Sequence, residues 1–376
     1  MIPYVLLMFV PLLFSFISFS AAFTEYNGKW SVRIGAKKEI LDHSCLIPVF
    51  FAMFIALLAL RDETIGRDLA NYKSYFNYYS SVDIKEIFKE KVDILYWLLN
   101  WLVGRFTDNY QVFLAIVALI TVLPMAKVYS EDRQHGFLKI VLFMNMTTFI
   151  MVFSGLRQSI AIAMGVVAYE FVKRKKPFLF LLFAAIAMGF HHTGFMILLL
   201  YPLYYITFKK RHLWFVIPGV LMVFVFNKPI FTWATNLLNS FWNGRYNVTI
   251  RDTGAYTTLF LFFLFAVFAY VLPDERKMDT ETHGLRNILL AALILQCFVP
   301  VHALAMRMNY YFIIFIPLLI PKILTNVKDS MRDIAGIAKV VLVGFFVLYY
   351  IIDIYIQCQT GITALDTYPY IFYWES

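Results

Sequence analysis

The stretch FSGLRQSIAIAM, residues 153–164, places an arginine and a glutamine inside a long apolar segment. Residues 137–172 carry only three formal charges, one of them on Arg157. An arginine at the centre of a membrane-spanning helix costs about 2.5–3.5 kcal/mol on insertion scales. A chain that turns at Ser154 and Gly155 avoids this cost, because Arg157 then opens a second helix at the membrane surface.

The composition indicates a membrane protein built from helices. Of the 376 residues, 61% are hydrophobic and 19% are aromatic, whereas soluble domains contain roughly 45–50% apolar residues. Apolar runs of about 15–20 residues recur along the chain, as in polytopic α-helical membrane proteins. No repeat or soluble segment interrupts them, so residues 1–376 are expected to form one integral membrane domain. The first run lacks a preceding basic residue, so we expect a span rather than a cleaved signal peptide.

Some apolar runs are too long for one span and are predicted to fold as hairpins. Residues 178–208 exceed the about 20 residues of a single transmembrane helix and lie between the basic clusters KRKK (173–176) and KKR (209–211). Cytoplasmic loops are rich in Lys and Arg. Both clusters are therefore expected inside, with the hairpin tip FHHTGF (190–195) outside.

The same charge rule predicts an all-α fold with about twelve transmembrane helices, within a range of about eleven to thirteen, and both termini outside. A further hairpin is expected to turn near Arg307. The expected spans are 2–22, 45–60, 110–127, 138–153, 157–172, 178–190, 193–208, 213–227, 257–272, 287–303, 309–321 and 339–356.

The two largest extramembrane elements are predicted on the outer face, at about 61–109 and 227–256. The apolar stretch 93–106 is short, and counting it as a span would move basic loops to the outside. We expect an amphipathic helix at the outer interface instead, although a spanning role stays open. Its expected interfacial anchors are aromatic, namely Tyr96, Trp97 and Trp101.

Polar residues gather at the predicted outer tips and loops. They are Arg157 with Gln158, His191 with His192, and His302 with Arg307 at the tips, and Arg67, Asp68, Arg245 and Arg251 in the loops. Any single arginine at a span end could be a snorkelling anchor. Their convergence on one side favours a site for an anionic substrate, because guanidinium forks match phosphate and carboxylate oxygens.

Arg157 can be oriented further from helical spacing. On a helix that starts there, Ala161, Gly165 and Ala168 share its face and form a stripe of small residues suited to close helix packing. Arg157 is therefore expected to point into the bundle. Gln158 lies about 100° away around the helix and need not share its target.

Several classes of site are not supported by the sequence. It contains no Walker A motif, no Asp-x-Asp pair and no G-x-S-x-G elbow. His191 and His192 are adjacent, which is wrong for two metal ligands on one helix face, so we expect no metal site and no cofactor. The basic clusters fit cytoplasmic loops rather than nucleic-acid binding. Guanidinium groups are thus expected to neutralise any phosphate.

The order of motifs resembles the EpsG/Wzy-like family of bacterial polysaccharide polymerases, which includes O-antigen polymerases. The resemblance covers most of the chain from about residue 45. The motifs are IGRDLANYKSYF (65–76), SGLRQSIAIAM (154–164), FHHTGFMILLLYPL (190–203), Arg245–Tyr246, RMNYYF (307–312) and YPY (368–370). The chain departs from the family pattern at Ile371, where a basic residue is expected, and His192 falls on a variable position.

The resemblance implies a GT-C-like glycosyltransferase in the bacterial inner membrane with its active site facing the periplasm. The growing glycan would pass from undecaprenyl pyrophosphate to the non-reducing end of the next lipid-linked repeat unit. Expected partners are this lipid-linked oligosaccharide, the bilayer, a flippase and a chain-length regulator, with no nucleic acid.

Roles can be assigned to residues on the basis of this resemblance. The expected pyrophosphate ligands are Arg157, Arg245 and Arg307. The general base is expected to be Asp68 or His191, and the choice stays open. Secondary substrate contacts are expected from Arg67, Tyr72, Gln158 and Tyr310. Aromatic residues that could stack on sugars, or form an interfacial belt, are Tyr72, Trp97, Trp101, Trp233 and Trp242.

Two other functions are compatible with the same motifs. A transporter or flippase for an anionic glycolipid would need polar groups along a route through the whole bundle. Here they concentrate at outer tips, which favours chemistry at one face. A polyprenyl-phosphate-dependent glycosyltransferase or an O-antigen ligase would share the architecture and differ in its acceptor.

Overall fold

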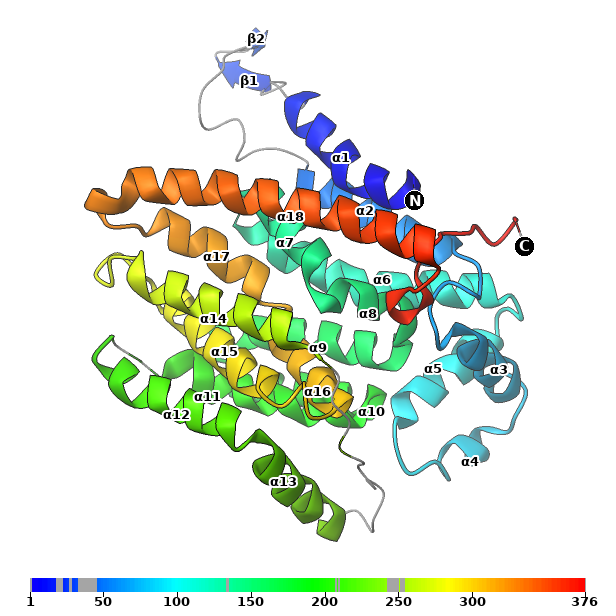
Figure 1. Cartoon of the computed structure of the whole chain (residues 1–376). Coiled ribbons are helices and arrows are strands. Elements are labelled where there is room, and N and C mark those ends of the chain that lie inside the picture. The colour runs from blue at the N-terminus through cyan, green and yellow to red at the C-terminus, as the bar shows by residue number, and fades with distance from the viewer. Residues whose placement is uncertain are drawn as a thin grey trace. The chain divides into compact units, whose positions relative to one another are not determined.

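The structure is a computed structural model. It describes residues 2–17, 23–26, 29–32, 46–132, 135–206, 208, 210–241, 250 and 254–375. The chain divides into two compact units, Met1–Phe195 with Ala338–Ser376, and Met196–Ile337. Nearly all described elements are helices (Figure 1), as the apolar composition predicts.

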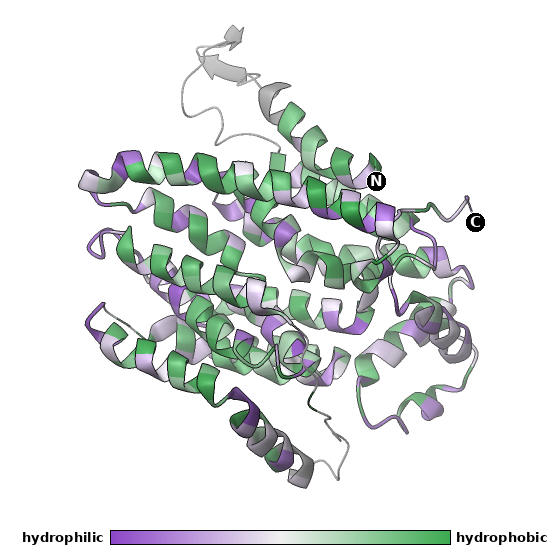
Figure 2. Ribbon diagram, in the orientation of Figure 1, coloured by the Kyte–Doolittle hydropathy of each residue, from purple (hydrophilic) through white to green (hydrophobic). Residues whose placement is uncertain are grey.

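The first unit is helical apart from one short antiparallel pair of strands. Its elements are α1 (Ile2–Ile17), β1 (Phe23–Tyr26), β2 (Lys29–Val32), α2 (Leu46–Leu60), α3 (Leu69–Tyr79), α4 (Ile84–Ile87), α5 (Ile94–Gly104), α6 (Tyr110–Glu131), α7 (Gly136–Asn145), α8 (Thr147–Ser154), α9 (Leu156–Lys173), α10 (Pro177–Phe190), most of α18 (Arg332–Thr360), and η5 (Ala364–Asp366). Helix α9 packs against α6 and α10, and α2 packs against α1 and α6. Figure 2 shows hydrophobic residues along most helices and hydrophilic residues in the loops and around α3 and α4.

The second unit is organised around α15. Its elements are the second half of the 3₁₀ helix η2 (His192–Leu199), α11 (Leu200–Tyr205), η3 (Lys210–His212), α12 (Leu213–Val225), α13 (Asn227–Phe241), α14 (Tyr256–Val271), α15 (Thr280–Gln296), α16 (Ala303–Ile313), α17 (Ile316–Thr325) and η4 (Asp329–Met331). Helix α15 packs against α11, α14, α16 and α17. Its buried Arg286 bonds the carbonyl oxygen of Phe208 at 2.6 Å and pairs with Glu275 at 3.2 Å, which ties the loops at this end of the unit together.

The helices support a membrane protein, while the predicted twelve spans stay a prediction. Within the described residues, two helical segments are long and apolar enough to cross a membrane, α6 and the segment Asp329–Thr360 that contains α18. The number rises to five if each bent pair is one span: α7 with α8, bent by 61°, α12 with α13, bent by 79°, and α16 with α17, bent by 45°. Other apolar helices are shorter; the 14 residues of α10 cover about 21 Å of a hydrocarbon core that is about 30 Å thick.

Two predicted breaks are confirmed and one is wrong. Helix α8 ends at Ser154 and α9 begins at Leu156, so the chain breaks at Gly155 as predicted. Helix α10 ends at Phe190, inside the predicted tip. The predicted turn near Arg307 is wrong, because Arg307 lies within α16.

The real connection between α15 and α16 covers residues 297–302. Pro300 lies in it and cannot donate the backbone hydrogen bond that a continuing helix needs. The ring of His302 then caps α16 by accepting from the backbone N–H of Leu304 at 3.0 Å. A proline and a histidine cap, rather than a charge, therefore determine where this hairpin turns.

Helix α5 is too short to span, as expected for residues 93–106, but its aromatic residues are not interfacial anchors. Its 11 residues extend about 16 Å. Tyr96 is fully buried and Trp97 is buried, whereas Trp101 is only partly buried. Tyr96 and Trp97 instead belong to a cluster that joins α3, α5 and α6, with Phe76 and Phe113 stacked at 4.8 Å. The anchoring role predicted for Tyr96 and Trp97 is therefore wrong.

The loop after α2 is joined to the C-terminal segment, residues 364–373. The backbone N–H of Asp62 donates to Ile371 at 3.0 Å, and that of Gly66 donates to Asp366 at 2.9 Å. These bonds fix the loop that leads into α3.

Arg61, at the start of this loop, is 1% exposed, and its guanidinium lies 5.4 Å from the ring of Phe153. Its charge follows the C-terminal end of α2, where helix carbonyl groups favour a cation. The aromatic face of Phe153 adds a cation–π contribution to the same charge.

Replacing Gly66 by alanine is expected to destabilise the first unit. Gly66 has a φ of +117°, and a Cβ atom would lie 2.2 Å from the carbonyl oxygen of Phe153. We expect a loss of roughly 1–3 kcal/mol, measured as a lower thermal midpoint of the purified protein in detergent. Gly344→Ala in α18 is the control, because its added methyl group meets no atom within 4 Å. An equal decrease in both variants would contradict this account.

Candidate functional site

An ion pair between Arg157 and Asp93 lies at the centre of the candidate site. The Nη1 atom of Arg157 donates to Oδ2 of Asp93 at 2.8 Å. The carboxylate is 1% exposed, whereas the arginine side chain keeps 27% of its surface. The guanidinium carbon lies 5.3 Å from the ring of Trp97 and 5.8 Å from that of Tyr72. Arg157 is therefore paired with a carboxylate and flanked by aromatic faces, and part of it remains open to a ligand.

Asp93 was missed by the sequence analysis. It directly precedes α5 in a left-handed conformation, with φ 58° and ψ 30°, and its side chain does not cap the helix. Few residues other than glycine adopt this conformation, and aspartate is among those that do. The only local signal is an aspartate before an apolar helix, which is the pattern of an ordinary N-cap. Its real partners are 64 and 99 residues away in sequence.

The two histidines also face Asp93. The backbone N–H of His192 donates to Oδ1 of Asp93 at 2.9 Å. The Nδ1 atom of His191 lies 3.5 Å from Oδ2, and that of His192 lies 3.6 Å from Oδ1. We call Asp93, Arg157, His191 and His192 the Asp93 cluster.

The backbone around the histidines explains how both rings reach one carboxylate. His191 directly follows α10 in an extended conformation, with φ −154°, and η2 begins at His192. The N–H of Gly194 donates to the carbonyl of His191 at 2.8 Å. A Cβ atom on Gly194 would lie 2.7 Å from the backbone of Ala187 in α10. The glycine thus lets this turn pack against α10.

Burial and charge set the protonation of the cluster. Burial alone would raise the pKa of Asp93, but the adjacent His191 and His192 and the charge of Arg157 together hold this pKa well below its usual value. Burial lowers the pKa of His191, although the nearby carboxylate of Asp93 opposes this effect. At neutral pH the cluster therefore contains a carboxylate, a guanidinium and a neutral His191 that can accept a proton.

The cluster also bears on the expectation that no metal binds here. Ligand atoms of Asp93, His191 and His192 lie within 4.8 Å of one another. The expectation assumed that both histidines lie on one helix. His191 has an extended backbone instead, so this assumption does not hold. However, Arg157 donates to the same carboxylate, and its positive charge opposes a divalent cation. We assign the carboxylate to the guanidinium, and the absence of a metal stays a prediction.

Asp68, the other candidate base, lies at the turn that precedes Arg157. The hydroxyl group of Ser154 donates to Oδ2 of Asp68 at 3.2 Å, and the backbone N–H of Asp68 lies 3.3 Å from the same hydroxyl oxygen. The negative charge of Asp68 also acts on Tyr72, which contacts Arg157. Both candidate bases thus belong to the surroundings of Arg157.

The remaining predicted residues have different environments. Arg67 pairs with Asp366 of the C-terminal segment at 3.2 Å, with both side chains exposed. Gln158 and Tyr72 are buried, as is the predicted small-residue stripe below Arg157.

Other predicted residues lie in the second unit or outside the described part. Arg307 is exposed and Tyr310 is buried in α16 of the second unit, so their approach to the Asp93 cluster stays a prediction. Trp233 is 66% exposed. Arg245, Arg251 and Trp242 lie outside the described residues.

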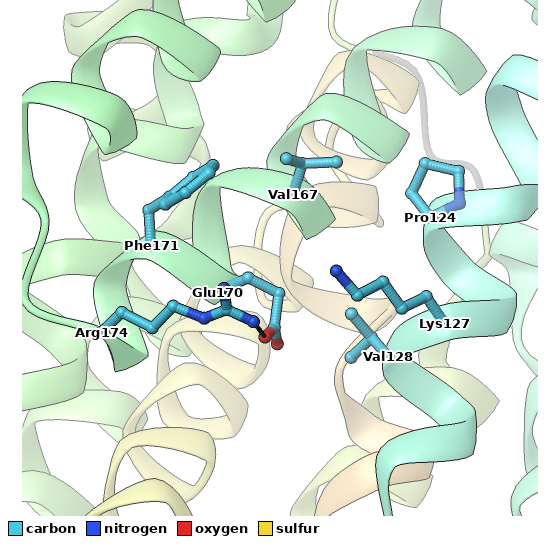
Figure 3. A pocket seen from close by; sticks show the side chains of 7 residues that line it. All are labelled: Pro124, Lys127, Val128, Val167, Glu170, Phe171 and Arg174. Atoms are coloured by element: carbon cyan, nitrogen blue, oxygen red, sulfur yellow. Dashed lines mark ion pairs between the residues drawn. The ribbon is translucent and has the colours of Figure 1, made fainter.

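A second charged group lies at the opposite end of α9. A small cavity of about 60 Å³ lies between α6 and α9. Figure 3 shows the side chains that line it, with Lys127, Glu170 and Arg174 at its polar side. Lys173 bridges Glu170 at 2.8 Å and Glu131 at 2.6 Å. Both helices end here, so the cations also compensate the helix dipoles. We interpret these ion pairs as structural interactions that join the ends of α6 and α9.

Comparison with known proteins agrees with the motif order. A family model, the EpsG family, matches residues 44–372. No curated protein and no solved structure matches the chain significantly. The matched range contains every member of the Asp93 cluster and covers most of the sequence. The chain therefore belongs to the EpsG family.

Proposed function

We propose that the protein is a polysaccharide polymerase of the bacterial inner membrane that acts at the periplasmic face. It transfers a growing glycan from undecaprenyl pyrophosphate to the non-reducing end of an incoming lipid-linked repeat unit. Family membership supports a polymerase-type membrane glycosyltransferase. The single observation that carries the proposal is that the partly exposed Arg157 guanidinium and the ring of His191 both lie next to the buried carboxylate of Asp93.

Arg157 is proposed to bind the diphosphate and stabilise the charge that develops when it leaves. A guanidinium can donate two parallel hydrogen bonds to phosphate oxygens. The rings of Trp97 and Tyr72 flank the guanidinium before substrate arrives. Removing one such prearranged donor lowers the reaction rate by about 10²–10³-fold. Arg245 and Arg307 are proposed as further ligands, and no metal is required in this scheme.

His191 is proposed as the general base. The acceptor hydroxyl oxygen attacks the anomeric carbon, its proton passes to His191, and the bond from that carbon to the diphosphate oxygen breaks. The undecaprenyl diphosphate leaves as an anion, so no general acid is needed. Asp68 is the weaker candidate, because its carboxylate already accepts a hydrogen bond from Ser154.

Arg157→Ala is expected to abolish long polymer in cells that lack the native gene, because the diphosphate loses its guanidinium. Polymer length is read from the ladder of glycolipids on a gel. Arg157→Lys should fail to restore the ladder, since an ammonium group cannot form the bidentate contact. Arg276→Ala is the control, because this exposed arginine pairs with its near neighbour Asp274. A normal ladder for Arg157→Ala would refute the role of Arg157.

His191→Asn is expected to lower the rate of polymerisation by roughly 10²–10⁴, the value of a general base. Asp68→Asn should keep most of the activity, because an amide oxygen can still accept from Ser154. Initial rates are measured with purified protein and saturating lipid-linked repeat unit. The opposite order of the two variants would transfer the role of base to Asp68.

Purified protein given one lipid-linked repeat unit is expected to produce chains of increasing length without added metal, and chelator should not slow the reaction. The products are separated by mass. Transfer to a lipid A–core acceptor without chain growth would instead identify a ligase. No transfer to either acceptor would support the transporter.

A further inference from the structure

The proposed function leaves the side chain of Asp93 without a role in the reaction. Its two oxygens accept from Nη1 of Arg157 at 2.8 Å and from the backbone N–H of His192 at 2.9 Å. Only 1% of the side chain is exposed. An incoming diphosphate would therefore meet a guanidinium that already has an anionic partner.

The two contacts of Asp93 differ in their freedom to move. The N–H of His192 belongs to the backbone of a turn that packs closely against α10 through Gly194. The guanidinium of Arg157, in contrast, is the end of a flexible side chain in the first turn of α9 and is 27% exposed. The carboxylate is the fixed partner of the ion pair, and the guanidinium is the one that can turn towards a ligand.

A fixed carboxylate next to the ligand site also makes binding depend on the charge of the ligand. A phosphodiester carries one negative charge and gains little by replacing a carboxylate that also carries one. A diphosphate carries more charge and more acceptor oxygens, so it competes better for the same guanidinium. The carboxylate therefore discriminates between ligands, because it weakens the binding of a phosphodiester more than the binding of a diphosphate.

We propose that Asp93 is a specificity-determining residue that competes with the substrate for Arg157. It holds the guanidinium in the free protein, yields it to a lipid diphosphate, and denies it to the singly charged phosphodiesters of membrane lipids. This proposal rests on the proposed role of Arg157 in binding the diphosphate. In this proposal Asp93 positions Arg157 and lowers the affinity for the lipid diphosphate. A residue that only supported Arg157 would raise that affinity.

The test measures binding of undecaprenyl pyrophosphate to the full chain in nanodiscs of phosphatidylcholine. Asp93→Asn keeps an oxygen for the N–H of His192 but removes the charge. It is expected to bind the diphosphate about tenfold more tightly than the wild type, because a competing and repelling charge at close range is gone. In the polymerisation assay KM should fall and kcat should also fall, because Arg157 and His191 lose their common partner.

Asp93→Glu is the matched control, since it keeps the charge and should show no gain in affinity. Equal or weaker binding by Asp93→Asn would overturn the proposal and make Asp93 a plain structural anchor. If Arg157→Ala binds the diphosphate as well as the wild type, the proposed role of Arg157 fails first, and this result is distinct from a failure at Asp93.

A second comparison tests the discrimination between lipids. Nanodiscs that contain phosphatidylglycerol should inhibit diphosphate binding by Asp93→Asn more than binding by the wild type. Equal inhibition of the two proteins would overturn the claim of selectivity.

The wild-type protein offers a readout that does not depend on a folded Asp93 variant. The ring of Trp97 lies 5.3 Å from the guanidinium, so movement of Arg157 should shift tryptophan emission when the diphosphate binds. The shift should be lost in Trp97→Phe. Saturating diphosphate without any change in emission would show that Arg157 stays on Asp93, and would contradict the exchange.

Discussion

The ion pair between Arg157 and Asp93 is the interaction on which the candidate site depends. A buried carboxylate and a largely enclosed guanidinium are each costly to remove from water, and each is tolerated because the other is present. The pair joins the first turn of α9 to the residue that opens α5, and the backbone after α10 completes it. Three segments far apart in sequence are thus positioned by one charge pair.

Aromatic residues of α3 and α5 lie next to the guanidinium of this pair. Tyr72 and Trp97 face the guanidinium, and the cluster that contains them anchors both helices on α6. Their flat, rigid side chains exclude water from two sides of Arg157. Tyr72, Tyr96 and Trp97 thus pack in the interior of the fold.

The helical character of the fold and two of its breaks could be predicted from the sequence, because the length of an apolar run is a local property. The breaks at Gly155 and at the double histidine follow from segments too long for one span. The predicted turn near Arg307 was wrong, because the prediction relied on the charge of Arg307. It did not use Pro300, which lies in the actual turn. The sides assigned from charge stay a prediction, whereas backbone chemistry determines where a helix ends.

The candidate site was predicted only in part, for a physical reason. Arg157, His191 and Asp68 are conspicuous in apolar or motif-rich surroundings, so their chemistry could be read from the sequence. Asp93 resembles an N-cap, and its function arises from partners 64 and 99 residues away. No periodicity or spacing within a single sequence reports such a pairing. Trp97 was misassigned in the same way, because its exposure depends on what packs over it.

The pairing of the loop after α2 with the C-terminal segment has a consequence for biosynthesis. The first unit is discontinuous, since the chain of the second unit lies between residues 195 and 338. Residues 61–68 leave the ribosome well before their backbone partners at 364–373. The loop that carries Asp68 is therefore fixed only after the segment 364–373 has been made. A ribosome that stops early would release a chain with its histidines and arginine present and this loop still unpaired.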